Sequence, residues 1–140
     1  MNSTELQLLQ PRNLKQHNHM GLSEFLSGQA EIKNIIYNTQ DPDFDVIFSG
    51  RFAPNPVELL GGKRLSALLS NMRNIYDYVI IDTPPLGTVI DAAVMAPACD
   101  GAIMVITPGK ITNTEAHEVK KQLVKSGCTI LGAILNDIYG

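Results

Sequence analysis

The chain has 140 residues, about the length of one compact domain and enough to bury a hydrophobic core. Its composition is 44% hydrophobic and 18% charged, which excludes a disordered or fibrous chain. The formal net charge of −3 gives no electrostatic reason to bind nucleic acid or an anionic membrane surface. No apolar run is long enough to cross a bilayer, so we expect no direct membrane insertion and a cytoplasmic location.

The first 20 residues differ in character from the rest of the chain. They are rich in amide side chains and show little hydrophobic periodicity. We therefore expect an irregular N-terminal arm over 1–20, with at most a short helix from Leu6 to Leu9. Regular patterning starts at Gly21, so the expected folded domain spans 21–140.

Helix signals recur through the expected domain as capping residues followed by apolar residues at helical spacing. The first two predicted helices are a short one capped by Ser23 and one over 31–37. The third starts at Asn55-Pro56, is interrupted by Gly61-Gly62 and then continues to about Ile75. The fourth spans 91–98, and the fifth begins at the capping box of Thr112 and Glu115 and stops at Gly127.

Short apolar runs between these helices are typical of buried strands. They cover 44–48, 78–82, 102–106 and 129–135. Strands that alternate with helices along the chain form βαβ units, whose strands run parallel. The predicted fold is therefore α/β, with three layers: a parallel sheet covered by helices on both faces.

The strand over 78–82 ends in a carboxylate, Asp82, which is followed by a turn containing Thr83 and Pro84. Open α/β sheets bind their ligands at the carboxyl ends of the strands. In phosphate-binding folds, an aspartate at this place holds Mg²⁺, directly or through a water molecule. The alternative is that Asp82 caps the next helix or ties the turn together. The Thr-Pro-Pro turn favours the metal role.

The motif that normally accompanies such an aspartate, G-x-x-x-x-G-K-[ST], does not occur in the sequence. Gly61-Gly62-Lys63 and Gly109-Lys110 lack the required glycine spacing and the hydroxyl residue. The sequence therefore carries one half of a nucleotide site. Asn136 follows the last predicted strand, where its amide either binds an adenine edge or is an ordinary exposed side chain.

Six segments occur together, in one order and at similar spacings, in a single known family. The chain resembles the cytoplasmic domain of the bacterial tyrosine kinases that control capsular and exopolysaccharide synthesis, which belong to the deviant-Walker P-loop class together with the MinD and ParA ATPases. The resemblance covers about residues 21–138 and implies a partial P-loop NTPase fold that lacks its N-terminal strands. The segments are Gly21-Leu-Ser-Glu-Phe-Leu-Ser-Gly28, Asp45-Val-Ile-Phe-Ser-Gly50, Pro54-Asn-Pro-Val-Glu-Leu-Leu60, Tyr76-Asp-Tyr-Val-Ile-Ile-Asp-Thr-Pro-Pro85, Asp91-Ala-Ala and Leu131-Gly-Ala-Ile-Leu-Asn136.

The resemblance also implies an activity, cofactors and partners. The activity is transfer of the ATP γ-phosphate to tyrosines, with ATP and Mg²⁺ as cofactors. Asp82 corresponds to the catalytic magnesium ligand, Thr83 and Pro84 to its flanking turn, and Asn136 to the region near the nucleotide base. The implied partners are other kinase subunits and a transmembrane adaptor of the chain-length-determinant type, which would bring the protein to the inner face of the cell membrane.

The sequence departs from the family pattern at several points. No phosphate loop precedes the matched region, and the tyrosine-rich tail is absent. Where the family has a second acidic strand end, this chain has Leu9-Gln10-Pro11-Arg12 without the aspartate. We therefore expect a truncated kinase that is inactive alone. The alternatives are a fragment of a MinD/ParA-like ATPase and a non-catalytic pseudokinase or interaction module.

Overall fold

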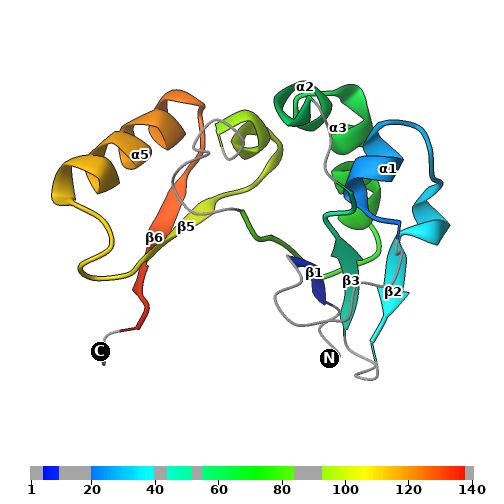
Figure 1. Cartoon of the computed structure of the whole chain (residues 1–140), viewed down its shortest axis with the longest axis horizontal. Helices are drawn as coiled ribbons and strands as arrows, with labels where there is room; N and C mark the ends of the chain where they lie inside the picture. The colour runs from blue at the N-terminus through cyan, green and yellow to red at the C-terminus, as the bar shows by residue number, and fades with distance from the viewer. Residues whose placement is uncertain (1–4, 10–19, 40–43, 52–54, 84–92, 138–140) are drawn as a thin grey trace. The chain divides into compact units, whose positions relative to one another are not determined.

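The computed structural model describes residues 5–9, 20–39, 44–51, 55–83 and 93–137 (Figure 1). The chain divides into two compact units, Met1–Thr83 and Pro84–Gly140. Each unit contains its own parallel strand pairing.

The first unit contains a four-stranded sheet in the order β2-β3-β1-β4. Its central strand, β1, pairs in parallel with β3 on one side and with β4 on the other. The short strand β2 pairs with β3 in the antiparallel sense at the edge. The carboxyl ends of β1, β3 and β4 therefore lie at one edge of the sheet. The strands are β1 Glu5–Leu9, β2 Ile36–Asn38, β3 Phe44–Phe48 and β4 Tyr78–Ile81.

The helix expected from Leu6 to Leu9 is wrong, because these residues belong to strand β1. A segment of this length forms too few hydrogen bonds to offset the cost of starting a helix. Pairing with two neighbouring strands instead satisfies its backbone on both sides. Residues 10–19 lie outside the described residues, so a domain boundary at residue 20 stays a prediction.

The helix expected over 31–37 is also wrong. Ile32–Asn34 forms a single 3-10 turn, η1, and Ile36–Asn38 forms strand β2. β-branched residues fit a pleated edge better than a helix, and here they gain contacts that the helix would lack. The Tyr37 ring packs against Phe48 of β3 with the ring centroids 5.2 Å apart.

Helix predictions based on strong local signals are confirmed in the first unit. Helix α2 spans Pro56–Leu60 with Asn55 at its N-cap, and α3 spans Lys63–Met72, so Gly61-Gly62 separates two helices as expected. The apolar face of α3 lies in the core together with the fully buried Ile35 and Ile47. That face consists of Leu65, Leu68, Leu69 and Met72.

The described part of the second unit contains a parallel strand pair and the helix that connects the two strands. Strands β5, Ala102–Ile106, and β6, Ile130–Leu135, pair in parallel, and α5 spans Asn113–Lys125 beside them (Figure 1). The predicted capping box is confirmed, because Thr112 Oγ1 accepts from the Glu115 N–H and Glu115 Oε2 accepts from the Thr112 N–H. The described strands form a four-stranded sheet in the first unit and a two-stranded sheet in the second.

The helix predicted over 91–98 is only partly described. The 3-10 helix η3, Ala96–Ala98, lies at its end, and Asp91 lies outside the described residues. The core of this unit contains the buried residues Ala96, Leu123 and Cys128. Among the described residues, no helix has the length and apolar character needed to span a membrane.

A buried tyrosine links three parts of the first unit. Tyr76, which is 7% exposed, donates its hydroxyl proton to Asp45 Oδ2 at 2.6 Å. The other carboxylate oxygen of Asp45 accepts from Asn38 Nδ2, also at 2.6 Å. Burial, with the hydrogen bond to Asp45 and its negative charge, raises the pKa of Tyr76 to about 12. The interaction ties the segment after α3 to β3 and to the edge strand β2.

Replacing Tyr76 with phenylalanine removes this hydrogen bond and keeps the ring. We expect the Tyr76→Phe variant to lose about 1–2 kcal/mol of unfolding free energy, measured by urea denaturation at neutral pH. Tyr78→Phe is the matched control, because Tyr78 is 63% exposed. Equal losses in the two variants would show that the Tyr76–Asp45 interaction adds nothing to stability.

The raised pKa of Tyr76 also predicts how stability changes in alkali. The phenol is protonated in both states below its ordinary pKa of 10.0, where its contribution is complete. As the pH rises from 10.0 to about 12, the unfolded chain ionises first and the contribution is lost. The stability difference between wild type and Tyr76→Phe should therefore shrink over this range in urea titrations. A constant difference would contradict the raised pKa.

Candidate functional site

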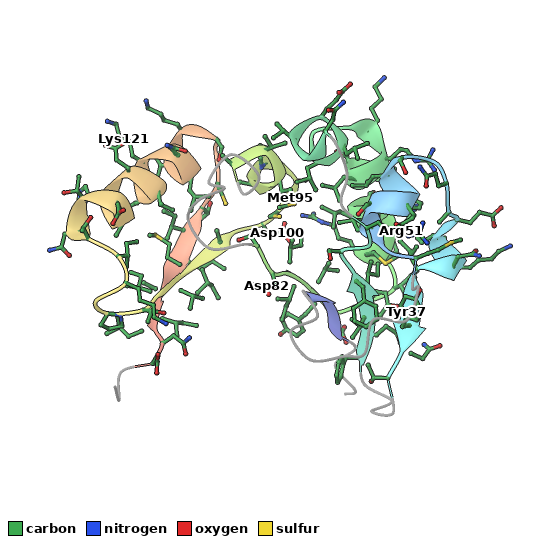
Figure 2. All side chains as sticks on the ribbon, viewed as in Figure 1. Tyr37, Arg51, Asp82, Met95, Asp100 and Lys121 are labelled. Atoms are coloured by element: carbon green, nitrogen blue, oxygen red, sulfur yellow. The ribbon has the colours of Figure 1, made fainter. Side chains whose placement is uncertain are left out.

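Asp82 lies directly after β4, at the carboxyl edge of the four-stranded sheet, and its side chain is exposed (Figure 2). In the strand register, Leu8 of β1 lies opposite Ile81 of β4 and Ile47 of β3. The segments that follow β3 and β4 therefore leave the sheet at the same edge. This is the edge at which parallel sheets bind ligands.

The chemistry available at Asp82 is that of one solvent-accessible carboxylate. In the described part of the chain, no three His, Cys, Asp or Glu residues group closely enough to hold a metal ion by themselves. Mg²⁺ does not need such a group, because it keeps several waters and binds one or two carboxylates together with substrate phosphates. A single exposed aspartate therefore fits a magnesium–nucleotide complex rather than a fully protein-built metal site.

The other predicted site residues do not all lie beside Asp82 in the structure. Thr83 follows Asp82 and is partly buried, whereas Pro84 lies outside the described residues. Asn136 is exposed at the carboxyl end of β6 in the second unit, and its backbone N–H donates to the Ile106 carbonyl at 2.9 Å. Asp82 and Thr83 thus adjoin one another, and Asn136 belongs to a different unit.

A buried carboxylate, Glu24, fixes the loop that leaves β3 at this edge. Glu24 is 7% exposed and lies in α1, Leu22–Leu26. Its Oε2 accepts from the Gly21 N–H at 2.7 Å, and its Oε1 accepts from the Arg51 N–H at 3.0 Å. The sequence analysis did not identify this residue, because the loop it binds is 27 residues away in the chain.

Ser23 belongs to the same interaction, and its predicted role as helix cap is wrong. Gly21 is the N-cap of α1. The Ser23 hydroxyl instead donates to the Arg51 carbonyl at 2.7 Å, and the Ser23 N–H donates to the Ser49 carbonyl at 3.0 Å. We call this set of bonds among Gly21, Ser23, Glu24 and residues 49–51 the Glu24 clasp.

Two glycines make the clasp sterically possible. Gly50 has φ of 81°, which favours glycine, and a Cβ there would collide with the Glu24 carboxylate. A Cβ on Gly21 would collide with the backbone of Gly50 and Phe48. Burial alone would raise the pKa of Glu24, but the hydrogen bonds from Arg51 and Gly21 outweigh it and hold that pKa below its ordinary value.

Strand β1 ends at Leu9, the place where the family pattern has its second acidic strand end. Its position between β3 and β4 places it at the same carboxyl edge as Asp82. Gln10, Pro11 and Arg12 lie outside the described residues.

Comparisons with known proteins agree with the resemblance found in the sequence. A family model described as an AAA domain matches residues 1–127. The tyrosine-protein kinase CpsD of Streptococcus agalactiae is 42% identical over 118 residues, which are 84% of this chain and 52% of that kinase. The kinase domain of Escherichia coli tyrosine kinase ETK superposes with a TM-score of 0.83 and 35% identity, covering 96% of this chain and 55% of that domain.

A more distant structure shows how widely the fold is shared. The cell division ATPase MinD of Pyrococcus furiosus has a TM-score of 0.67 and 23% identity, covering 89% of this chain and 52% of the ATPase. This likeness shows the fold alone. The predicted P-loop NTPase fold class is confirmed, and the chain spans about half the length of the curated relatives it matches.

The Glu24 clasp predicts that replacing the Glu24 carboxylate with an amide lowers the free energy of unfolding by a large amount. Glu24→Gln keeps the shape but removes a charged acceptor from two backbone N–H groups, so we expect a loss of about 2–3 kcal/mol in urea unfolding at neutral pH. Because the pKa of Glu24 is lowered from 4.5, its contribution is present above that pH and fades as the pH falls further. The difference between the two proteins should fade in the same way.

Glu31→Gln is the control for this experiment. Glu31 is exposed and pairs with the exposed Lys33, and such surface pairs contribute about 0–1 kcal/mol. Similar losses for Glu24→Gln and Glu31→Gln would mean that the clasp is not a stabilising element.

Proposed function

The chain belongs to the AAA-domain family and is homologous to bacterial tyrosine kinases, and from this membership we propose that it supplies part of an ATP-dependent protein-tyrosine kinase. The proposed reaction transfers the ATP γ-phosphate to tyrosine hydroxyls in the control of capsular or exopolysaccharide synthesis. The observation that carries the proposal is the exposed Asp82 at the carboxyl end of a parallel strand, in a fold shared with a tyrosine kinase domain.

In this proposal Asp82 is the catalytic carboxylate and holds Mg²⁺, directly or through a water molecule. A bound Mg²⁺ would neutralise charge on the nucleotide phosphates. Phosphate oxygens and water molecules would be its other ligands besides Asp82. Thr83 and Pro84 are the proposed residues that follow this metal ligand in the site, as the homology implies. Asn136 offers an amide donor and acceptor, which complement the hydrogen-bonding edge of adenine.

The proposed transfer also needs a backbone N–H cradle and a lysine near the transferred phosphate. The motif that provides both is not found in this sequence. We therefore propose that these 140 residues bind a nucleotide weakly and transfer phosphate only when a phosphate-binding loop is supplied to them. The same observation favours the second candidate, a non-catalytic interaction module that binds kinase partners without turnover.

The proposal extends to partners and location. A transmembrane adaptor of the chain-length-determinant type and other kinase subunits are the proposed partners, with the protein at the inner face of the cell membrane. The support is the homology to bacterial tyrosine kinases, together with a composition that gives no case for nucleic acid binding.

Metal binding tests the role of Asp82 directly. We expect the wild-type chain to bind Mn²⁺ in the presence of ATP, measured by electron paramagnetic resonance, and Asp82→Asn to weaken this binding about tenfold, because one charged ligand is lost. Glu31→Gln, which removes an exposed carboxylate far along the chain, should leave it unchanged. Equal binding by Asp82→Asn and wild type would remove the metal role from Asp82.

Incubation with ATP and Mg²⁺ separates the candidate functions when it is done with and without the unmatched part of the Streptococcus agalactiae kinase. Phosphotyrosine that depends on Asp82 supports the kinase. Released phosphate without phosphotyrosine supports an ATPase, and neither product under both conditions supports the interaction module.

A further inference from the structure

The Tyr37 hydroxyl bonds to the segment that the Glu24 clasp holds. Tyr37 belongs to β2 (Figure 2). Its hydroxyl donates to the Met20 carbonyl at 2.7 Å. Met20 directly precedes Gly21, whose N–H donates to the Glu24 carboxylate. One phenol group therefore joins β2 to the start of α1, within the first unit.

The negative charge of Glu24 also acts on this hydroxyl. Burial, and after it the charge of Glu24, raises the pKa of Tyr37. The two Glu24 oxygens already accept backbone hydrogen bonds from Gly21 and Arg51. A second negative charge at the Tyr37 oxygen would therefore meet both a carbonyl oxygen and a carboxylate whose position is fixed.

Tyr37 differs from the other two described tyrosines in what its hydroxyl can influence. Tyr76 is 7% exposed, and its hydroxyl bonds to Asp45. Tyr78 lies on β4, which is separated from β3 by β1. The Tyr37 bond is exposed, and β2 has only three residues, so this short strand opens locally more readily than a core strand. Tyr37 is therefore the described tyrosine at which an added group would act on the clasp.

Resting on the kinase function proposed above, we propose that Tyr37 is a phosphorylation site and that its phosphate opens the Glu24 clasp. The phosphate donor is ATP, used by a bacterial tyrosine kinase homologous to this chain. The Tyr37 oxygen forms a bond to the γ-phosphorus, and the bond between that phosphorus and the β,γ-bridging oxygen breaks. ADP leaves with the electron pair of the broken bond, and the phenol proton passes to water.

The modification changes Tyr37 from a hydrogen-bond donor into an anion. A phosphotyrosine has no phenol proton to donate to the Met20 carbonyl, and its charge is about −2 near neutral pH. That charge repels the carbonyl oxygen and the Glu24 carboxylate. Because Glu24 also holds the Arg51 N–H, moving α1 away from β2 releases the loop after β3. This loop leaves the sheet at the same edge as Asp82, so phosphorylation loosens one side of the proposed metal site.

The first test asks whether a kinase modifies Tyr37. The 140-residue chain is incubated with the kinase domain of Escherichia coli ETK, ATP and Mg²⁺, and phosphorylated residues are identified by mass spectrometry. Tyr139, which lies outside the described residues, is replaced by phenylalanine in every protein. We expect phosphate on Tyr37, lost in Tyr37→Phe and kept in the control Tyr78→Phe. Phosphate on another tyrosine alone, or on none, would overturn the assignment of this site.

The second test asks what the phosphate does. Phosphotyrosine is incorporated at residue 37 during synthesis of the chain, so no kinase is needed. Hydrogen exchange is measured at the clasp amides of Gly21, Ser23 and Arg51. We expect exchange at least about tenfold faster than in Tyr37→Phe, which loses the hydrogen bond without adding charge. Amides within α3 should exchange as in the wild type, which shows that the rest of the unit stays folded.

Exchange no faster than in Tyr37→Phe would contradict the proposal, because the phosphate charge would then add nothing. Slower exchange would also contradict it, since the phosphate would then tighten the clasp, for instance by pairing with the Arg51 guanidinium. Neither test uses kinase activity of this chain, so both are separate from the proposed function. A phosphorylated Tyr37 that opens the clasp, in a chain that makes no phosphotyrosine with the unmatched part of CpsD, supports the site and contradicts that function.

Discussion

The larger sheet depends on the two parallel pairings of β1, which joins β3 on one side and β4 on the other. Without β1, the two strands would have no common neighbour, and their carboxyl ends would not share an edge. This arrangement brings the loop after β3 and the turn at Asp82 to the same side of the sheet. The functional interpretation of Asp82 follows from that geometry.

Two carboxylates near this edge have opposite environments and therefore different roles. Glu24 is buried, and both of its carboxylate oxygens accept backbone hydrogen bonds. Its role is therefore structural, because these bonds fix the loop after β3. Asp82 is exposed at a strand end. A carboxylate that keeps its solvent access can exchange water for a hydrated cation, whereas Glu24 cannot do so without breaking the clasp.

Local sequence signals were sufficient to predict the helices that are specified by capping residues and apolar spacing within their own segments. Asn55 and Pro56 marked the start of α2, the Thr112–Glu115 capping box marked the start of α5, and the buried face of α3 followed from its spacing. The sequence could not show that residues 5–9 form a strand, because their partners come from distant segments. The Glu24 clasp was missed for the same reason. Residues 36–38 form a strand of only three residues, too short for its apolar spacing to separate a strand from a helix. Asp82 was predictable as a strand-end carboxylate, and its predicted metal role stays a proposal.

The central claim is that the carboxyl edge of this sheet holds a divalent cation at Asp82. Paramagnetic broadening of backbone amide signals by Mn²⁺, in the presence of ATP, locates the cation without depending on catalysis. The account predicts the strongest broadening at Asp82 and Thr83, weaker broadening at residues 49–51, and little at Tyr78, at the opposite end of β4. Strongest broadening at another carboxylate, such as Glu115 or Asp137, would contradict it.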